Sequence, residues 1–348
     1  MKQNKQIDLL ENALRGHRIS KEDALNLYRH AELPLLQHYA NKIRETLHKD
    51  LVRYSTCLFL YPTNFCENCC PLCSFYAPTD SSKGWFFSPN KLLENFDSTF
   101  QEVHIVGGLY HKCNLPYYQE LFSKIKEKAP HIHIKALSAV EYDYLARLHN
   151  TSIESILKSL QLHGLGSIPG GGAEILDDSV RKKIAPKKTD SQRFLEIHKT
   201  AHKLDIPTNI TMLFSHIESD EHIIDHLDQI RTLQDSSGGF STFIPLKFHA
   251  ENNLLGKKFL QPKDPYRIFA ISRLMLDNVP HIKTLWNYFG VDSALQLLDY
   301  GANDFSSTNS KEQVVLTAGA KPVPMDENAL KKLLQSKKRT TLSVHSGA

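Results

Sequence analysis

"TCLFLYPTNFCENCCPLC", residues 56–73, joins a short apolar β-type run to a loop that holds four of the six cysteines of the chain. The run ends at Pro62, and the four cysteines lie within the cysteine loop, "CENCCPLC", residues 66–73. Disulfides are improbable in a reducing cytosol, so clustered thiols of this kind indicate metal or redox chemistry. The position of the loop directly after a strand also guides the interpretation of the rest of the chain.

Short β-type runs alternate with amphipathic helical stretches through most of the sequence. The runs are at residues 56–62, 102–108, 131–138, 164–170, 208–214, 240–246, 281–287 and 313–319, and those at 164–170 and 313–319 are the weakest. Strands that alternate with helices predict a parallel sheet with crossover helices. Eight such units predict an α/β fold, a TIM-type (β/α)8 barrel over residues 54–320, or a partial barrel if the weak runs are not strands.

The two ends of the chain have other patterns. Residues 1–53 show helical periodicity, with Ser20 as the cap of one helix, and predict an N-terminal helical extension. Residues 321–348 predict a C-terminal helix followed by a loose tail, because the end of the chain is basic and rich in serine.

Composition excludes several classes of protein. The 348 residues are 41% hydrophobic and 23% charged, which is typical of a globular protein, and the net charge of +4 is too small and too evenly spread for a nucleic-acid interface. The densest basic patch, residues 182–183 with 187–188, is interpreted as solvated surface. No stretch approaches the length of a membrane span and the N-terminus lacks a secretory core, so we expect a cytoplasmic protein without membrane or nucleic-acid partners.

The barrel hypothesis requires chemistry at the carboxyl ends of the strands. Glycines, histidines and carboxylates do follow the predicted strands, as "GGLYH", "SAVE", "GGGAE", "SHIE" and "KFHAEN", and the cysteine loop follows the first strand. This distribution predicts a single active site at that face of the barrel.

Two kinds of metal centre fit the cysteine loop. Zinc usually takes two short cysteine pairs separated by a longer segment, and a site of three cysteines with His104 or His111 stays an alternative. Cys66, Cys70 and Cys73 instead form a Cys-x3-Cys-x2-Cys loop, which can supply three corners of a [4Fe–4S] cube and leave one iron without a protein ligand. That open iron can chelate the amino and carboxylate groups of S-adenosylmethionine, and Cys69 is then spare.

This spacing after a first strand resembles the radical S-adenosylmethionine (radical SAM) superfamily. The resemblance implies a [4Fe–4S] cluster, S-adenosyl-L-methionine and release of a 5'-deoxyadenosyl radical. The superfamily usually has an aromatic residue just before the third cysteine, where this chain has Leu72. We expect Phe75 or Tyr76 to supply the missing ring.

A longer resemblance, from about residue 18 to about residue 320, is to the radical enzymes of the futalosine pathway of menaquinone biosynthesis. It is carried by "HIVGGLY", "HIKALSAVE", "SIPGGGAEIL", "VRKKIAPKK" and "KFHAEN". "HIKALSAVE" and "FHAEN" look more like the synthase branch, and the cyclase branch shares the cysteine loop and "PGGGAEI".

The synthase resemblance implies a transferase reaction on an aryl enol ether dicarboxylate. The radical would add to the vinyl carbon of 3-[(1-carboxyvinyl)oxy]benzoate, the aryl group would migrate and a carboxylate would be lost, giving 6-amino-6-deoxyfutalosine. Such an enzyme needs a reducing electron donor such as flavodoxin or ferredoxin. A dehypoxanthine futalosine cyclase and a non-catalytic metal-binding protein are the alternatives.

Cofactor contacts are predicted at the second and third strand ends. Gly107 and Gly108 would let the backbone approach the methionine end of the cofactor, or else form an ordinary turn. Glu141, with Ser138, would accept the ribose hydroxyls, or else serve as a carboxylate at the start of a helix. Phe75 completes this predicted cofactor site.

Substrate contacts and catalytic groups are predicted beyond the fourth strand. Gly171 and Gly172 would pack against a planar ligand, with Glu174 directed inward as a catalytic group. Arg181 is the predicted clamp for a substrate carboxylate, since its guanidinium forms bidentate pairs, although a surface role is an alternative.

The fifth and sixth strands complete the predicted site. His216 is predicted to orient substrate or move a proton, and Glu218 to fix its tautomer; a hydrogen-bonded histidine at a strand end is the alternative. His249 is predicted to reach the second carboxylate of the substrate.

Overall fold

The computed structural model describes residues 3–307, 312–321, 323–345 and 347. The strands are β1 (Leu51–Ser55), β2 (Cys57–Leu60), β3 (Glu102–Ile105), β4 (His133–Ala136), β5 (Leu165–Ser167), β6 (Thr208–Phe214), β7 (Phe240–Lys247), β8 (His281–Thr284), β9 (Asp304–Ser307) and β10 (Thr340–Ser343). The helices that precede the main run of strands are α1 (Gln3–Leu14), α2 (Lys21–His30) and α3 (Leu33–His48).

The helices that alternate with or follow the barrel strands along the chain are α4 (Pro89–Leu92), α5 (Leu115–Lys128), α6 (Ala139–Leu148), α7 (Ile153–Leu162), α8 (Asp178–Ile184), α9 (Ser191–Lys203), α10 (Asp220–Ser237), α11 (Pro265–Met275), α12 (Trp286–Phe289), α13 (Val291–Gln296) and α14 (Gln313–Thr317). Helix α15 (Glu327–Ser336) follows, and two 3-10 turns span Lys257–Phe259 and Leu297–Tyr300.

Two all-parallel sheets make up the strand layer. One has the order β2-β3-β4-β5, and the other has the order β10-β1-β9-β8-β7-β6. Strands β1 and β2 are separated by Thr56 alone, so the chain passes directly from one sheet to the other. At the opposite edge a parallel bridge between Ile168 and Thr208 joins the end of β5 to β6. The two sheets therefore meet on both sides, and the α/β barrel predicted from the sequence is confirmed.

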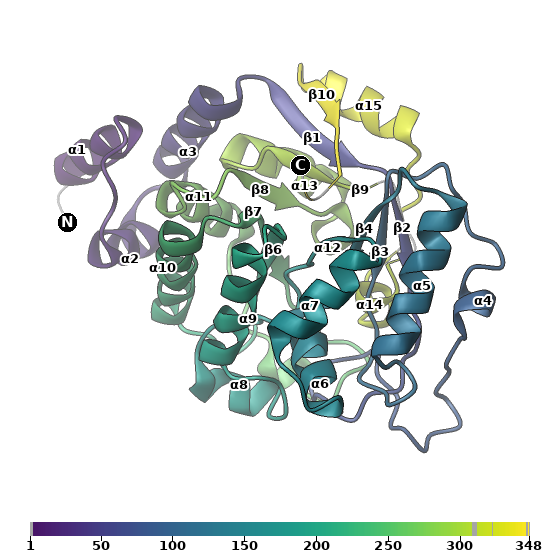
Figure 1. Cartoon of the computed structure of the whole chain (residues 1–348). Coiled ribbons are helices and arrows are strands. Elements are labelled where there is room, and N and C mark those ends of the chain that lie inside the picture. Colours follow the sequence, from purple (N-terminus) through teal and green to yellow (C-terminus); the bar gives the residue numbers. More distant parts are fainter. Residues whose placement is uncertain (1–2, 308–311, 322, 346, 348) are drawn as a thin grey trace.

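Helices cover the outside of this strand layer, as Figure 1 shows for the run from α5 to α11. Their amphipathic character explains the arrangement, since each buries one apolar stripe against the strands. Ile156, Leu157 and Leu160 of α7 are completely buried, whereas Leu162 at its end is exposed. Among the described residues, no helix has the length and apolarity needed to cross a membrane.

The last predicted strand is wrong. Residues 313–317 of the expected run form α14, and the corresponding position beside β1 is taken by β9. A short apolar run such as "QVVL" has no period that distinguishes a strand from a helix. The true strand was missed because "NDFSS" has the composition of a turn. The weak run at 164–170 does contain a strand, β5.

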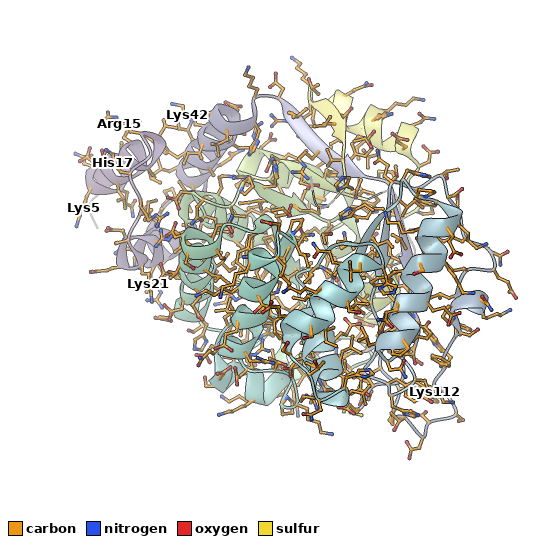
Figure 2. The ribbon with its side chains drawn as sticks, in the orientation of Figure 1. Lys5, Arg15, His17, Lys21, Lys42 and Lys112 are labelled. Atoms are coloured by element: carbon orange, nitrogen blue, oxygen red, sulfur yellow. The ribbon has the colours of Figure 1, made fainter. Side chains whose placement is uncertain are left out.

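The N-terminal extension packs against the barrel helices. Helices α1, α2 and α3 lie together at one side of the molecule, next to α10 and α11 (Figure 1). The Ser20 hydroxyl accepts from the amide of Asp23 at 3.1 Å, as a cap should. At the other end of α2, Arg267 donates to the carbonyls of Tyr28 and Ala31 at 3.0 and 2.8 Å. Figure 2 shows that basic side chains of the extension, among them Lys5 and Arg15, point away from the barrel.

The described part of the C-terminal tail is not loose. Strand β10 pairs in parallel with β1, from Leu51 opposite Thr340 to Tyr54 opposite Ser343. The Tyr54 hydroxyl also donates to the Glu327 carboxylate of α15 at 2.6 Å. The composition of the tail gave no sign of this, because the ordering comes from the free edge of β1, which lies far away in the sequence.

Because α15 packs on the barrel, we expect Leu330→Ala to destabilise the whole protein. The Leu330 side chain is completely buried, and deletion of a buried leucine side chain lowers the free energy of unfolding by about 2–5 kcal/mol. Urea unfolding followed by circular dichroism measures the loss. Lys332→Ala on the same helix is the control, and equal stability of both variants would contradict the packing.

Candidate active site

A cavity of about 350 Å³ runs along the inside of the barrel. Residues from both ends of β3 line it, from Glu102 at the amino end to Gly107 and Gly108 beyond the carboxyl end. The mouth of the cavity is formed by the cysteine loop, the segments after β3, β4 and β5, and α14. The chemistry predicted for the strand ends therefore meets at one opening, as the parallel arrangement requires.

The three predicted cluster ligands face this cavity. Cys66, Cys70 and Cys73 belong to its lining, and Cys69 does not. The Cys69 backbone has a φ of 45°, and its thiol donates to the carbonyl of Cys66 at 3.2 Å. The loop thus turns one sulfur away and directs three toward the same space.

The surroundings of the thiols alter their pKa values. Burial raises the pKa of the Cys70 thiol to about 11, and the neighbouring Lys188 opposes this shift. Burial likewise raises the pKa of Cys73. Among the described residues, no group of three or more His, Cys, Asp or Glu side chains is arranged to hold one metal ion. Three thiols that line one cavity can serve as corner ligands of a cube, and the zinc site considered as the alternative is not assembled among the described residues.

Gly107 and Gly108 hold the cysteine loop against the end of β3. A side chain on Gly108 would place its Cβ only 2.1 Å from the carbonyl oxygen of Phe65, and one on Gly107 would lie 3.0 Å from that of Thr63. The Gly108 amide donates to the Thr63 carbonyl at 3.0 Å. Both glycines also line the cavity, so close packing of two backbones and access for a ligand coexist here.

Glu141 serves first as a positioning residue. One carboxylate oxygen accepts from the amide of Gly107 at 3.0 Å, and the other accepts from the amide and hydroxyl of Ser138 at 2.7 and 2.8 Å. These bonds cap α6 and fix the glycine turn, so the predicted alternative of a helix-start carboxylate describes what the structure shows. Burial raises the pKa of Glu141 to about 7. Glu141 and Ser138 both line the cavity, and their contact with the ribose hydroxyls of the cofactor stays a prediction.

The glycine-rich turn after β5 presents an open surface and one ion pair. No atom lies within 4 Å of the position of a Cβ on Gly171, whereas Gly172 has a φ of +96° and packs against Val140. Glu174 has a φ of 51° and lines the cavity. Its carboxylate is paired with the Lys188 ammonium. Burial raises the pKa of Glu174, but the charge and hydrogen bond of Lys188, together with the charge of Arg181, outweigh burial and hold the pKa below its usual value.

Lys188 was missed by the sequence analysis, which placed it on a solvated surface. It lines the cavity mouth, and its side chain is 17% exposed. Its charge also acts on the Cys70 and Cys73 thiols. The signal in the sequence was too weak, because a lysine in a run of basic residues gives no indication that one member turns inward.

Arg181 does not line this cavity, which corrects its predicted role as a carboxylate clamp. The side chain is 3% exposed and donates to the carbonyls of Gly172, Ala173 and Thr189. Its guanidinium also lies 5.9 Å from the Phe194 ring centre. Arg181 therefore supports the glycine turn from behind and is a positioning residue.

His216 and Glu218 are likewise outside the cavity lining, contrary to their predicted catalytic roles. His216 is completely buried and its ring Nε2 pairs with the Leu213 carbonyl at 2.9 Å, while Nδ1 accepts from the Ile217 amide at 2.8 Å. Glu218 accepts from the amides of Ser215 and His216. Both side chains satisfy the sharp turn after β6, where Ser215 has a φ of 72°. The hydrogen-bonded histidine at a strand end is the arrangement found.

Phe75 and His249 do line the cavity. The Phe75 ring lies beside Tyr61 and Trp85, with ring centres 5.4 and 5.9 Å apart. His249 pairs with the carbonyl of Tyr288 through Nε2 at 3.2 Å, and burial lowers its pKa. Tyr76 and Leu72 share the lining with Phe75, so the predicted aromatic neighbours of the third cysteine are in place.

Comparison with known proteins agrees with this geometry. Residues 60–230 match the radical SAM superfamily, and residues 237–338 match the CofH/MqnC C-terminal region. An aminodeoxyfutalosine synthase of Thermus thermophilus is 37% identical over 91% of this chain and 88% of its own length. A cyclic dehypoxanthine futalosine synthase of Streptomyces coelicolor is 36% identical over 90% of this chain and 81% of its own.

A third relative has a different name. It is a 5-amino-6-(D-ribitylamino)uracil–L-tyrosine 4-hydroxyphenyl transferase of Methanothermobacter thermautotrophicus, 33% identical over 87% of this chain and 86% of its own. Among solved structures, a methylornithine synthase has a TM-score of 0.76 at 16% identity, covering 96% of this chain and 97% of its own. At that identity the likeness shows the fold alone.

A parallel barrel with three inward thiols at its mouth, together with these matches, defines a radical SAM enzyme. The chain belongs to the family of radical SAM transferases that carries the CofH/MqnC C-terminal region and includes the futalosine-pathway enzymes, as the resemblance predicted. Its cofactors are a [4Fe–4S] cluster and S-adenosylmethionine. When bound, the cluster supplies the electron that cleaves the sulfonium, and Cys66, Cys70 and Cys73 are placed to hold it.

The direction of the four sulfurs leads to a test on single cysteines. We expect Cys70→Ala to lose the iron–sulfur absorbance after anaerobic reconstitution, since a corner ligand is removed. Cys69→Ala should retain the absorbance, because the Cys69 thiol lies outside the cavity lining and donates to the backbone carbonyl of Cys66. Iron and sulfide content per chain measure both variants, and loss of the cluster in Cys69→Ala would contradict the assignment.

A second test addresses the contact between β3 and the cysteine loop. Gly108→Ala forces its Cβ into the Phe65 carbonyl, so the loop must shift and the iron content should fall to less than half of the wild-type value. Gly171→Ala is the matched control, because its Cβ meets open space. Equal iron content in the two variants would show that the close contact does not position the loop.

Proposed function

We propose that the chain is an aminofutalosine synthase. In this proposal it joins the 5'-deoxyadenosyl group of S-adenosylmethionine to the vinyl carbon of 3-[(1-carboxyvinyl)oxy]benzoate, with loss of one carboxylate, and forms 6-amino-6-deoxyfutalosine. The observation that carries the proposal is the cavity, whose lining extends from the cysteine loop at the mouth to Glu102 and Lys283 inside the barrel.

The walls of the cavity suit an aromatic acid. Phe59, Tyr61, Ile244 and Leu246 line the cavity and offer apolar surface to a ring. Cationic groups lie along the same wall, including Lys247 beside His249 at the exit of β7. A dicarboxylate that binds in a water-poor space requires such groups, because an unpaired buried carboxylate is costly.

The residues at the mouth would have distinct tasks in this reaction. Gly107 and Gly108 expose backbone close to the three thiols, where the amino acid end of the cofactor would lie. Gly171 leaves space for a planar group, and Glu174 with Lys188 forms a fixed ion pair beside it. Enclosure by the barrel keeps water and other quenchers away from a reactive carbon radical.

A cyclic dehypoxanthine futalosine synthase is the second candidate, because a relative with that name is 36% identical over 90% of this chain. The products separate the two functions. The synthase joins adenosine covalently to the substrate skeleton, whereas the cyclase would release free 5'-deoxyadenosine. We propose flavodoxin or ferredoxin as the electron donor in either case.

The proposal is tested by an anaerobic reaction of the reconstituted protein with dithionite, S-adenosylmethionine and the enolpyruvyl benzoate, followed by mass spectrometry. We expect a covalent adenosyl product from the wild type and a yield at least 100-fold lower from Cys70→Ala. Free 5'-deoxyadenosine from dehypoxanthine futalosine, with no adduct from the benzoate, would replace the synthase by the cyclase.

A further inference from the structure

The closed end of the cavity, at the amino ends of the strands, is charged. We define the floor as Ser55, Glu102, His104, Lys135 and Lys283, all of which line the cavity. Barrel interiors are usually filled by layers of Val, Ile and Leu side chains. Polar and charged residues in place of such a layer call for a reason other than packing.

The register of the strands directs these side chains inward together. His104 on β3 is paired with Phe59 on β2 and with Lys135 on β4, so the three side chains project to the same face. On the opposite side of the ring, Lys283 on β8 is paired with Asp304 on β9. Ser55 ends β1, next to the start of β2.

Cations outnumber carboxylates in and directly behind the floor. The Lys135 ammonium lies 2.5 Å from the Glu102 carboxylate, and Lys283 lies 3.3 Å from that of Asp304. Arg53 approaches the same Asp304 carboxylate, with Nε at 4.0 Å. Three cations thus face two carboxylates, and one positive charge is left over in this group of described residues.

One further cavity carboxylate, Glu312, interacts with the floor through the charge of Lys135, which opposes the rise in the Glu312 pKa caused by burial. Glu312 accepts from the hydroxyl of Tyr288, which lies beyond the carboxyl end of β8, at 3.3 Å. Glu312 is therefore bonded toward the mouth and also lies within reach of the Lys135 charge. Glu141 and Glu174, the remaining carboxylates of the lining, are engaged with backbone amides and with Lys188 there.

Hydrogen-bonding groups of the floor have no protein partner among the described residues. Among them are the Ser55 hydroxyl and Nε2 of His104, and behind them Nε and Nη2 of Arg53. Oδ1 of Asp304, beside Lys283, also has no hydrogen-bond partner there. Ser55 is only 2% exposed and faces the cavity. Buried polar groups are nearly always hydrogen-bonded, so these groups indicate a ligand. Burial lowers the pKa of His104 well below its usual value, so the ring is neutral and one of its nitrogens carries a hydrogen to donate.

We propose that the floor binds the carboxylate on the arene ring of the substrate, with Lys283 as its ionic partner and Ser55 and His104 as hydrogen-bond donors. The inference rests on the proposed function, since it assigns the orientation of that substrate. The vinyl carbon must lie near the cofactor at the mouth, and the enol carboxylate is attached to the same vinyl group. The arene carboxylate is then the end that points down the barrel, past the apolar wall of Phe59 and Leu246.

The test compares the substrate with its analogue in which the arene carboxylate is replaced by a carboxamide. Anaerobic isothermal titration calorimetry measures both affinities for reconstituted wild-type protein and for Lys283→Met. We expect the wild type to prefer the carboxylate by about 10- to 100-fold, the usual effect of a charge-assisted hydrogen bond. In Lys283→Met that preference should fall below 3-fold, while the affinity for the carboxamide changes less than 3-fold.

Lys158→Met is the matched control, because it removes the same charge from an exposed position on α7. It should leave both affinities unchanged. Thermal unfolding checks that each variant is folded. If Lys283→Met does not fold, Lys283→Met with Asp304→Asn removes the ammonium without leaving Asp304 charged, and the same loss of preference is expected from it.

Two results would overturn the proposal: no preference for the carboxylate in the wild type, or an equal loss of affinity for both ligands in the variant, as a merely structural lysine would give. Failure of the proposed function is recognised separately, as absence of the adenosyl product from the wild type. In that case benzoate and benzamide are the probes. A benzoate preference that disappears in Lys283→Met supports an anion site in the floor, and its absence overturns the site as well.

Discussion

The approach of Gly108 to the Phe65 carbonyl and to the Cβ of Cys66 is the constraint on which the active site depends. A Cβ at this position would lie 2.1 Å from the Phe65 oxygen, so the two chain segments touch without a side chain between them. The amide of Glu67 also donates to the carbonyl of Leu109 at 3.0 Å, and Glu141 secures Gly107 from the next unit of the barrel. The segments that follow β2, β3 and β4 are thereby held together. The position of the cysteine loop therefore depends on its contacts with the two neighbouring units of the barrel.

Buried ion pairs mark the two ends of the same cavity. Glu174 and Lys188 form one at the mouth, and Glu102 and Lys135 form the other at the floor. Desolvation makes such pairs poor sources of stability, since apolar residues of similar volume would serve the fold as well. Their presence is understandable if the cavity must hold charged molecules, because a fixed polar environment replaces the water that those molecules lose.

The sequence predicted those features that follow from periodicity and from close spacing. Alternating runs gave the barrel, and the intervals between Cys66, Cys70 and Cys73 gave the thiols that face the cavity. The roles of Arg181 and His216 were misjudged because both looked like chemistry-bearing side chains in loops. Backbone carbonyls at sharp turns need partners, and these two side chains satisfy them. Which polar groups are consumed in this way depends on turn geometry, which one sequence does not contain.

Some polar side chains of the barrel bind backbone groups in turns, and others line the cavity. This difference bears on how members of the family act on different substrates. Relatives named as an aminodeoxyfutalosine synthase, a cyclic dehypoxanthine futalosine synthase and a 4-hydroxyphenyl transferase match 87–91% of this chain, so the architecture alone does not select the substrate. Polar side chains in the turns after the strands, such as Glu141 and Glu218, hold the backbone and have little freedom to change. The strand residues that line the cavity, such as His104 and Lys283, carry no such duty toward the turns. We therefore expect substitutions there to alter what the barrel accepts while leaving the cluster site intact.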